Sequence, residues 1–149
     1  MRRRCVQGRA RCPEGVRGEV SDRQEYRVEG LPEPFSHYTD AVRADDLLFV
    51  SGCVSVDAEG NVVGVGDVVA QARQVFANIR LCLAAAGATF ADVVKVTTFL
   101  TDIEDRAKIN PVRQEVFGHA RPASTLVEVS ALVLPEFLIE VEAVAVVPS

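Results

Sequence analysis

The sequence has no tryptophan, and aromatic residues of all kinds make up only 6% of its 149 positions. Hydrophobic residues nevertheless reach 48%, so the apolar surface must come mainly from Val, Ala, Leu and Ile. That amount is enough to build one core. Because these residues favour β-strands and closely packed helices, the composition predicts a single domain of mixed α/β class.

Long apolar runs and paired cysteine motifs are absent as well. No stretch approaches the roughly 20 apolar residues that a membrane-spanning helix needs. The Arg-rich start is not followed by the apolar segment of a secretory signal. The four cysteines, Cys5, Cys12, Cys53 and Cys82, form no CxxC pair, so neither a zinc site nor a disulfide framework is indicated. We therefore expect a cytoplasmic protein with reduced thiols, no bound metal and no membrane partner.

Positive charge is scarce beyond the first residues. The net charge is −5, but residues 1–23 carry seven arginines against three acidic residues, which leaves −9 for residues 24–149. An acidic surface repels phosphate backbones, so we expect no nucleic-acid partner. Residues 1–24 are rich in Arg, Gly and Pro and lack apolar periodicity. This composition predicts a disordered tail before a domain at 25–149.

One helix is the best supported element of the chain. Asp67 is a suitable N-cap and Gly87 is a suitable residue just beyond the C-terminal end, with apolar side chains at one-face spacing between them. The opposite face is expected to be solvated, because it carries polar residues: Gln71, Arg73, Gln74 and Asn78.

A second helix and several strands follow from similar patterns. Asn110 and Pro111 have the order of an N-cap and a first helical residue, and Gly118 follows Phe117 as a helix end. Runs of β-branched or alternating apolar residues predict strands. These strands lie at 47–51, followed by a hairpin turn at 57–61, and at 93–100, 126–129 and 138–147.

Several short segments occur in a characteristic order. They are the Ser-Gly pair at 51–52, Ala-Ala-Gly-Ala at 85–88, DVVKVTTFLTD at 92–102, Arg-Pro-Ala at 121–123, Val-Glu-Val at 127–129 and IEVEAVAV at 139–146. As an ordered set they resemble the RidA/YjgF family of enamine and imine deaminases. The resemblance implies a chorismate-mutase-like fold: a mixed β-sheet with two helices packed on one face. It also implies a homotrimer with ligand clefts between subunits, and a cofactor-free hydrolase that converts small enamines and imines to ketones and ammonia.

The resemblance further implies which residues line the cleft. A tyrosine, an asparagine and a last-strand glutamate do so in that family, and they correspond to Tyr38, Asn110 and Glu140. The family's glutamate positions or activates water, a role that suits a carboxylate partly buried among apolar neighbours. The ordinary alternatives are a core tyrosine, a helix-capping asparagine and a solvated glutamate like Glu142.

Ser124 stands where the family has the arginine that binds the substrate carboxylate. A guanidinium offers two parallel charge-assisted bonds to a carboxylate, whereas a hydroxyl offers one neutral bond. We therefore expect substrates other than small free 2-imino acids. The alternative is a trimeric binding or regulatory module without catalysis. Arg121, three residues earlier, either lies on the surface or reaches the cleft in part.

Cys53 and His37 also depart from the family pattern. Cys53 stands where glutamine is usual, and His37 stands where many relatives have proline. A nearby base such as His37 would lower the pKa of the Cys53 thiol enough for nucleophilic chemistry. A free cysteine at the end of an apolar strand is more often a small buried hydrophobe. Both residues are expected to line the cleft, and both interpretations of the thiol stay open.

Overall fold

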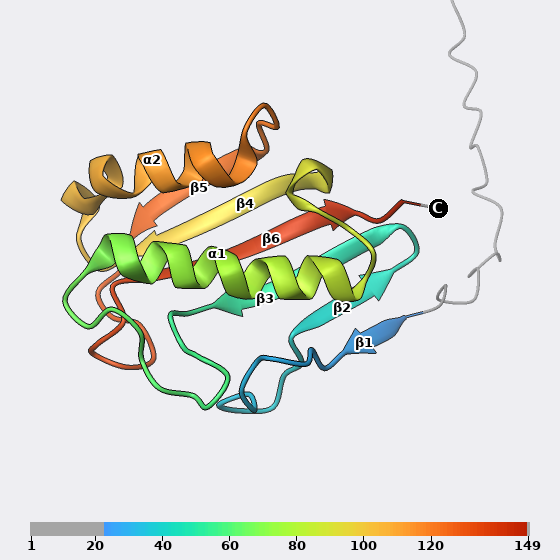
Figure 1. Cartoon of the computed structure of the whole chain (residues 1–149), viewed down its shortest axis with the longest axis horizontal. Coiled ribbons are helices and arrows are strands. Elements are labelled where there is room, and N and C mark those ends of the chain that lie inside the picture. The colour runs from blue at the N-terminus through green and yellow to red at the C-terminus, as the bar shows by residue number, and fades with distance from the viewer. Residues whose placement is uncertain (1–22, 149) are drawn as a thin grey trace, which may run out of the picture.

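A six-stranded sheet forms the centre of the computed structural model, which describes residues 23–148 (Figure 1). Its strands are β1 (Gln24–Tyr26), β2 (Ala41–Ala44), β3 (Leu47–Cys53), β4 (Val93–Leu100), β5 (Ala123–Glu128) and β6 (Ile139–Val146). Two α-helices, α1 (Val68–Ala85) and α2 (Arg106–Phe117), follow β3 and β4. Short 3₁₀ turns precede β4 (Phe90–Asp92) and α2 (Ile103–Asp105).

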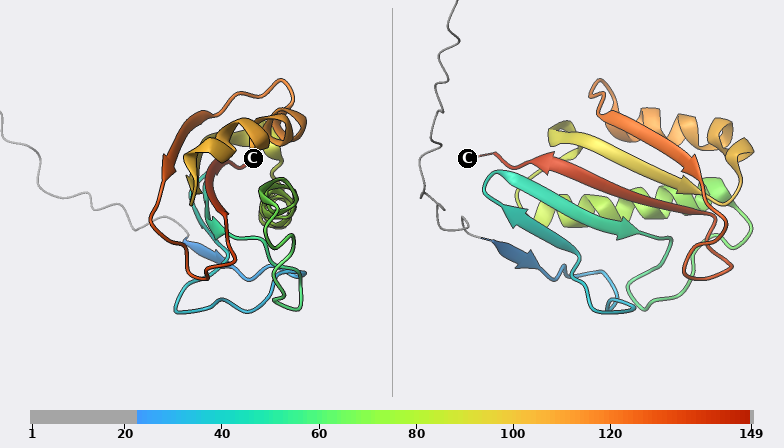
Figure 2. Two further views of the ribbon diagram at one scale, coloured as in Figure 1. Left: turned by 90° about the vertical axis from the view of Figure 1, so that its left-hand side faces the viewer. Right: turned by 180° about the vertical axis from the view of Figure 1, so that it is seen from behind.

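The strand order is β1-β2-β3-β6-β4-β5. All neighbouring strands are antiparallel except β4 and β5, which are parallel and are joined by α2. Both helices lie on the same face of the sheet, and the other face is open (Figure 2). This confirms the mixed sheet with two helices on one face that was predicted from the sequence.

The core lies between the sheet and α1. On β6 the alternate residues Ile139, Val141 and Ala143 are buried toward the helices, while Glu140 and Glu142 point to the open face. The helix contributes its apolar stripe, which includes Ala72, Val75, Phe76, Ile79 and Leu83. Burying a side chain of the larger apolar types stabilises the fold by about 1.5–3 kcal/mol each.

The predicted ends of α1 are confirmed. The Asp67 carboxylate accepts hydrogen bonds from the backbone N–H groups of Val69 and Ala70, both at 3.0 Å. Gly87 has a φ of 76°, in the left-handed region that glycine adopts without strain. The Ala88 N–H donates to the Leu83 carbonyl at 2.9 Å, which completes a Schellman motif.

The polar face of α1 is exposed at Arg73, as predicted, but two loops fold against other parts of it. Gln71 and Asn78 are buried. Gln71 donates to the carbonyl of Glu136 at 2.8 Å and accepts from the N–H of Leu138 at 2.8 Å. Asn78 donates to the carbonyls of residues 54 and 56 at 3.1 and 3.0 Å. The two amides therefore fix the segments that follow β3 and precede β6.

The predicted start of the second helix is wrong by five residues. α2 begins at Arg106, and Pro111 lies inside it with Asn110 in the turn before. Asp102 caps the preceding 3₁₀ turn by accepting from the Glu104 N–H at 2.9 Å, and that turn continues directly into the helix. Asn110 is therefore an exposed helical residue and caps nothing.

Other boundaries differ slightly from the predictions, among them that of β5, which begins at Ala123 and not at residue 126. Gln24 already belongs to β1 and pairs with Arg43, although it was assigned to a tail at 1–24; residues 1–22 lie outside the described part of the chain. The turn at 57–61 is present, but a single bridge between Val56 and Val62 closes it. Among residues 23–148 no helix is long and apolar enough to cross a membrane, and no cluster of His, Cys, Asp or Glu is arranged to hold a metal ion.

Candidate functional site

Glu140 and Tyr38 line the same cleft, which has a volume of about 290 Å³. The cleft lies where the loop before β2, the end of β3 and the start of β6 meet, and Val133 from the loop before β6 forms part of its wall. Ser51 and Gly52 also line it. The structure thus brings together two of the predicted site residues.

The position of the Glu140 carboxylate depends on Gly52. A Cβ atom built on Gly52 would lie 1.9 Å from Oε1 of Glu140, closer than real Cβ contacts ever come. The pairing of β3 with β6 shifts between Val50 and Cys53, so an irregularity in the sheet occurs at this point. The glycine leaves the space in which the carboxylate lies beside the β3 backbone.

Burial raises the pKa of Glu140 above the ordinary value of a glutamate, and the neighbouring negative charge of Glu142 raises it further. The side chain is half-buried and receives no hydrogen bond from the described residues. A carboxylate in this state retains its capacity to accept a proton from a water molecule in the cleft. Glu142, by contrast, is exposed.

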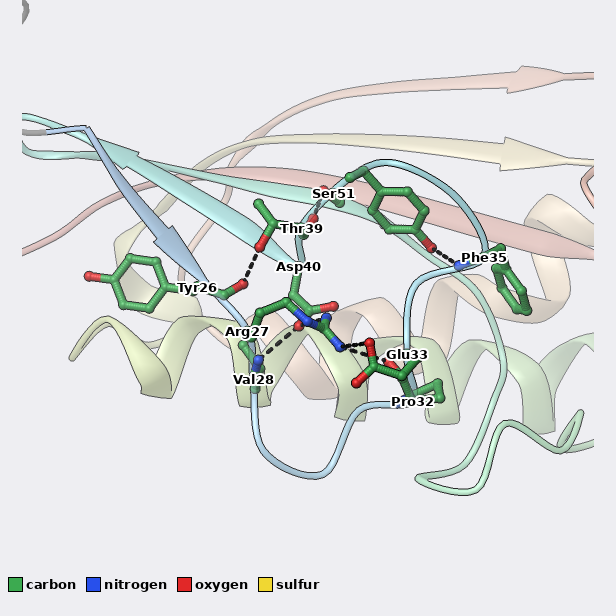
Figure 3. A network of polar contacts seen from close by, with 10 residues as sticks. Tyr26, Arg27, Val28, Pro32, Glu33, Phe35, Thr39, Asp40 and Ser51 are labelled. Atoms are coloured by element: carbon green, nitrogen blue, oxygen red, sulfur yellow. Dashed lines mark hydrogen bonds and ion pairs between the residues drawn. The ribbon is translucent and has the colours of Figure 1, made fainter.

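The loop that carries Tyr38 is held by a network of polar contacts (Figure 3). The buried Asp40 carboxylate pairs with Arg27 and accepts from the Val28 N–H at 2.8 Å. Ser51 on β3 donates to the carbonyl of Thr39 at 2.6 Å. These contacts fix Thr39 and Asp40, the two residues that follow Tyr38 in the sequence, so this end of the loop has a defined place against the sheet.

Tyr38 lies at the open side of this cleft. Its side chain is 44% exposed, and its hydroxyl accepts from the Phe35 N–H at 3.3 Å. The Phe35 ring in turn contacts the buried ring of Phe137, with 6.4 Å between centroids. Tyr38 is therefore a cleft residue with a hydroxyl that a ligand can approach, and the alternative of a core tyrosine is wrong.

Cys53 and His37 are not brought together. Cys53 lines a small cavity of about 50 Å³ together with Cys82, whereas His37 lines a neighbouring groove and does not line that cavity. A hydrogen bond with the Cys82 thiol and burial raise the pKa of Cys53 well above its usual value. A raised pKa reduces the thiolate fraction, so the geometry favours a structural role for Cys53.

Asn110 and Ser124 belong to a second group of residues, on the helix side of the sheet. Ser124 pairs in register with the buried Val96, and its hydroxyl accepts from Nη2 of Arg113 on α2 at 2.7 Å. Asn110, Arg113 and Arg121 line a cavity of about 390 Å³ beside this contact. It shares no lining residue with the Glu140 cleft, so within one chain the predicted site is divided into two groups.

Comparison with known proteins identifies the family. Residues 29–147 match the model of the family described as Endoribonuclease L-PSP, which includes the RidA and YjgF proteins. The chain belongs to this family. It is 43% identical to a RutC family protein from Pyrococcus horikoshii over 118 residues, which are 79% of this chain and 93% of that protein. It is 42% identical to the 3-aminoacrylate deaminase RutC of Acinetobacter baylyi over 117 residues, 78% of this chain and 92% of that protein.

Solved structures of the RidA/YjgF family have the same fold. The YjgF gene product of E. coli superposes with a TM-score of 0.76 at 33% identity, over 83% of this chain and 98% of that one. The chorismate-mutase-like fold predicted from the sequence is therefore confirmed. Ser124 therefore differs from the sequence pattern described above in a chain that does belong to the family.

Sequence reasoning missed the roles of three residues that form the candidate site or support the segments around it. Arg113 was not singled out, because nothing in a linear sequence shows that a helical arginine meets the serine eleven residues later. Gln71 was assigned to a solvated face. Gly52 was noted only as part of a motif, although the same Ser-Gly pair was the available signal for a close approach of another chain segment.

Proposed function

We propose that this RidA/YjgF protein is a cofactor-free hydrolase of imines or enamines, with Glu140 as the residue that orients and deprotonates water. The observation that carries the proposal is the half-buried Glu140 carboxylate beside Tyr38 in one cleft, with Gly52 leaving its space open. Hydrolysis of a C=N bond moves protons and no electrons. Acid–base side chains are therefore sufficient for it.

The reaction consumes one water molecule and releases one molecule of ammonia. Glu140 accepts a proton from water as its oxygen bonds to the imine carbon, and the π electrons of the C=N bond move to nitrogen. Return of that proton to nitrogen gives a carbinolamine. The hydroxyl proton of the carbinolamine then passes to its nitrogen, and ammonia leaves as the C–N bond breaks and the carbonyl forms. An enamine first becomes the imine by gaining a proton on carbon and losing one from nitrogen. Tyr38 offers a hydroxyl to a polar group of the substrate in the same cleft.

The substrate is one other than a small free 2-imino acid. Ser124 supports this choice because its hydroxyl carries no charge for a carboxylate held next to the reacting carbon. The 3-aminoacrylate deaminase relative adds support, since the substrate in its name carries nitrogen on the third carbon, one atom farther from the carboxylate than in a 2-imino acid. A nitrogen compound of this longer kind fits the departure at position 124.

The protein is proposed to act as a homotrimer with clefts between subunits. The open face of the sheet supports an assembly, because it exposes large apolar side chains on neighbouring strands, among them Leu47 and Phe49 on β3 and Val146 on β6. Such a surface is usually covered by another protein chain. Assembly between subunits would also let the two groups of site residues, which are separate within one chain, face one cleft.

The partner is proposed to be a small molecule in the cytoplasm, and not a nucleic acid. The family description names an endoribonuclease, but residues 24–149 carry a net charge of −9, which disfavours the approach of an RNA backbone. A second candidate function is a trimeric binding or regulatory module without catalysis. The replacement of the family arginine by Ser124 is the observation in its favour.

The deciding experiment supplies the purified protein with imines that an amino-acid oxidase generates in place from varied amino compounds, and follows ammonia and carbonyl formation. The proposal expects turnover of at least one imine, and 2-iminopropionate hydrolysis at least tenfold slower than by a relative that has the arginine, or about 1.4 kcal/mol of transition-state binding. Comparable rates on 2-iminopropionate would refute the substrate proposal. Binding without any turnover would favour the regulatory module.

A further inference from the structure

Arg113 on α2 is a partly buried guanidinium without an acidic partner. Its Nη2 donates to Ser124 at 2.7 Å, and its Nε is buried with no hydrogen-bond acceptor. Burial lowers its pKa, which reflects the loss of water around the charge. In residues 23–148 some of the other basic side chains form ion pairs with carboxylates, such as Arg73 with Glu115 at 2.9 Å. The charge of Arg113 is not neutralised in this way.

The cavity beside Arg113 has the composition of an anion site. It has a volume of about 390 Å³, and its lining includes a second arginine, Arg121, and the amide of Asn110, but no acidic residue. Phe117 provides an apolar wall. Two guanidinium groups raise the local positive potential in a domain that is otherwise acidic. A small anion with an apolar body would satisfy both the charge and the wall.

We infer that Arg113, held by Ser124 and assisted by Arg121, binds the carboxylate of the substrate in place of the family arginine that Ser124 replaces. A carboxylate is favoured over a phosphate because its single charge and apolar body suit two guanidinium groups beside amides and an aromatic ring, whereas the higher charge of a phosphate calls for further cations that the cavity does not supply. The role as a substrate subsite rests on the proposed function. The binding itself does not.

Supplying the guanidinium from α2 and not from β5 also changes the position at which a carboxylate is bound. A guanidinium bonded directly to Ser124 lies closer to the β5 backbone than one carried at the end of a long side chain at position 124. A carboxylate bound to Arg113 would therefore lie closer to β5 than one bound to an arginine at position 124. This explains how the protein can retain carboxylate recognition and still discriminate against small 2-imino acids.

The test is a binding titration of the full-length protein with propionate, with propionamide as the neutral isostere and inorganic phosphate as the competing anion. The buried Nε–H of Arg113 gives a nuclear magnetic resonance signal that exchanges slowly with water, and propionate should shift it. We expect Arg113→Gln to weaken propionate binding at least tenfold, Arg113→Lys to weaken it less, and Arg121→Gln to weaken it two- to fivefold. The matched control Arg73→Gln, on the exposed face of α1, should have no effect.

A rescue variant separates binding from folding. The double variant Arg113→Gln with Ser124→Arg carries its guanidinium on β5 in place of α2. It should restore at least part of the propionate affinity. The inference is overturned if propionate does not bind, if propionamide or phosphate binds as tightly, or if Arg113→Gln and Arg113→Lys both bind normally. Propionate binding without hydrolysis of any imine would instead leave this site intact and remove the proposed catalytic function.

Discussion

The absence of a side chain at Gly52 is what allows the Glu140 carboxylate to lie against β3. The φ of Gly52 is outside the left-handed region, so the backbone itself would accept alanine, and the three atoms nearest to an added Cβ all belong to Glu140. The motif residue and the proposed catalytic residue are therefore a single packing unit. They come from strands that are neighbours in the sheet and about 90 residues apart in sequence.

Gly52→Ala should reduce hydrolysis at least tenfold, because the carboxylate must leave its position to avoid the new methyl group. A double-mutant cycle with Glu140→Gln measures whether the effect passes through Glu140. In the Glu140→Gln background the alanine should change the remaining rate little. An equal loss in both backgrounds would show that Gly52 acts on the backbone and not on Glu140.

Glu140→Gln should lower turnover about 100-fold or more, since the amide keeps the size of the side chain but cannot accept the proton. Because the native pKa of Glu140 is raised, the rate of the unmodified protein should fall at a pH above the ordinary pKa of a glutamate as the solution is acidified. The variant should lack this limb. Steady-state rates between pH 4 and 8, roughly the window in which such carboxyls titrate, test both points.

The same substitution has a defined sign for stability. A carboxyl with a raised native pKa binds its proton more tightly in the folded state, so its contribution is fully present below the unfolded pKa and is lost as pH rises through the native one. Glutamine does not ionise. The melting temperature of Glu140→Gln at neutral pH should therefore be no lower than that of the unmodified protein, and a clear decrease would indicate a structural role for the charge.

Gln71→Ala should reduce the free energy of unfolding by about 3 kcal/mol, because the Leu138 N–H and the Glu136 carbonyl lose their partner in a buried place. The loop before β6, which carries Val133 of the cleft, should loosen as well. The control Arg73→Ala removes only an exposed ion pair and should cost less than about 1 kcal/mol. Urea unfolding gives both values, and equal effects would contradict the buried role.

Phe49→Glu should convert the proposed trimer to monomers, because it places a charge in the apolar open face of the sheet. The matched control is Val65→Glu, a substitution of a more exposed residue (66%) in the loop before α1, which should leave the trimer intact.

Removing residues 1–22 should also leave the mass per assembly and the folding unchanged, since all core elements follow them. Light scattering decides each case. A monomeric unmodified protein would refute the assembly.

Much of the fold was predictable because its signals are local. Asp67 and Gly87 each lie within one helical turn of an end of α1, so the local sequence predicts both ends of the helix. The β-branched run at 93–100 coincides with β4. The errors arose where distant segments decide the outcome. Gln71 and Asn78 have the spacing of a solvated face, and only the loops that fold onto them reveal that they are buried.

The candidate site was predictable in its members more than in its arrangement. Tyr38 and Glu140 share a cleft, as the family resemblance implies. Asn110 is a helical residue and not a cap. The 3₁₀ turn that begins after Asp102 continues directly into α2, so the Asn-Pro pair lies inside the helix. The bond between Arg113 and Ser124 joins a helix to an edge strand, and such a contact depends on how α2 crosses the sheet.

The last strand along the chain, β6, lies in the middle of the sheet between β3 and β4. During synthesis on the ribosome, β3 and β4 must therefore wait with their inner edges unpaired until residues 139–146 have emerged. The nascent chain can form its helices early, but the pairing of β6 with β3 and β4 is delayed. Until then the unpaired edges of β3 and β4 are prone to aggregation. Glu140 arrives with this final strand, so the proposed catalytic group is put in place at the step that completes the fold.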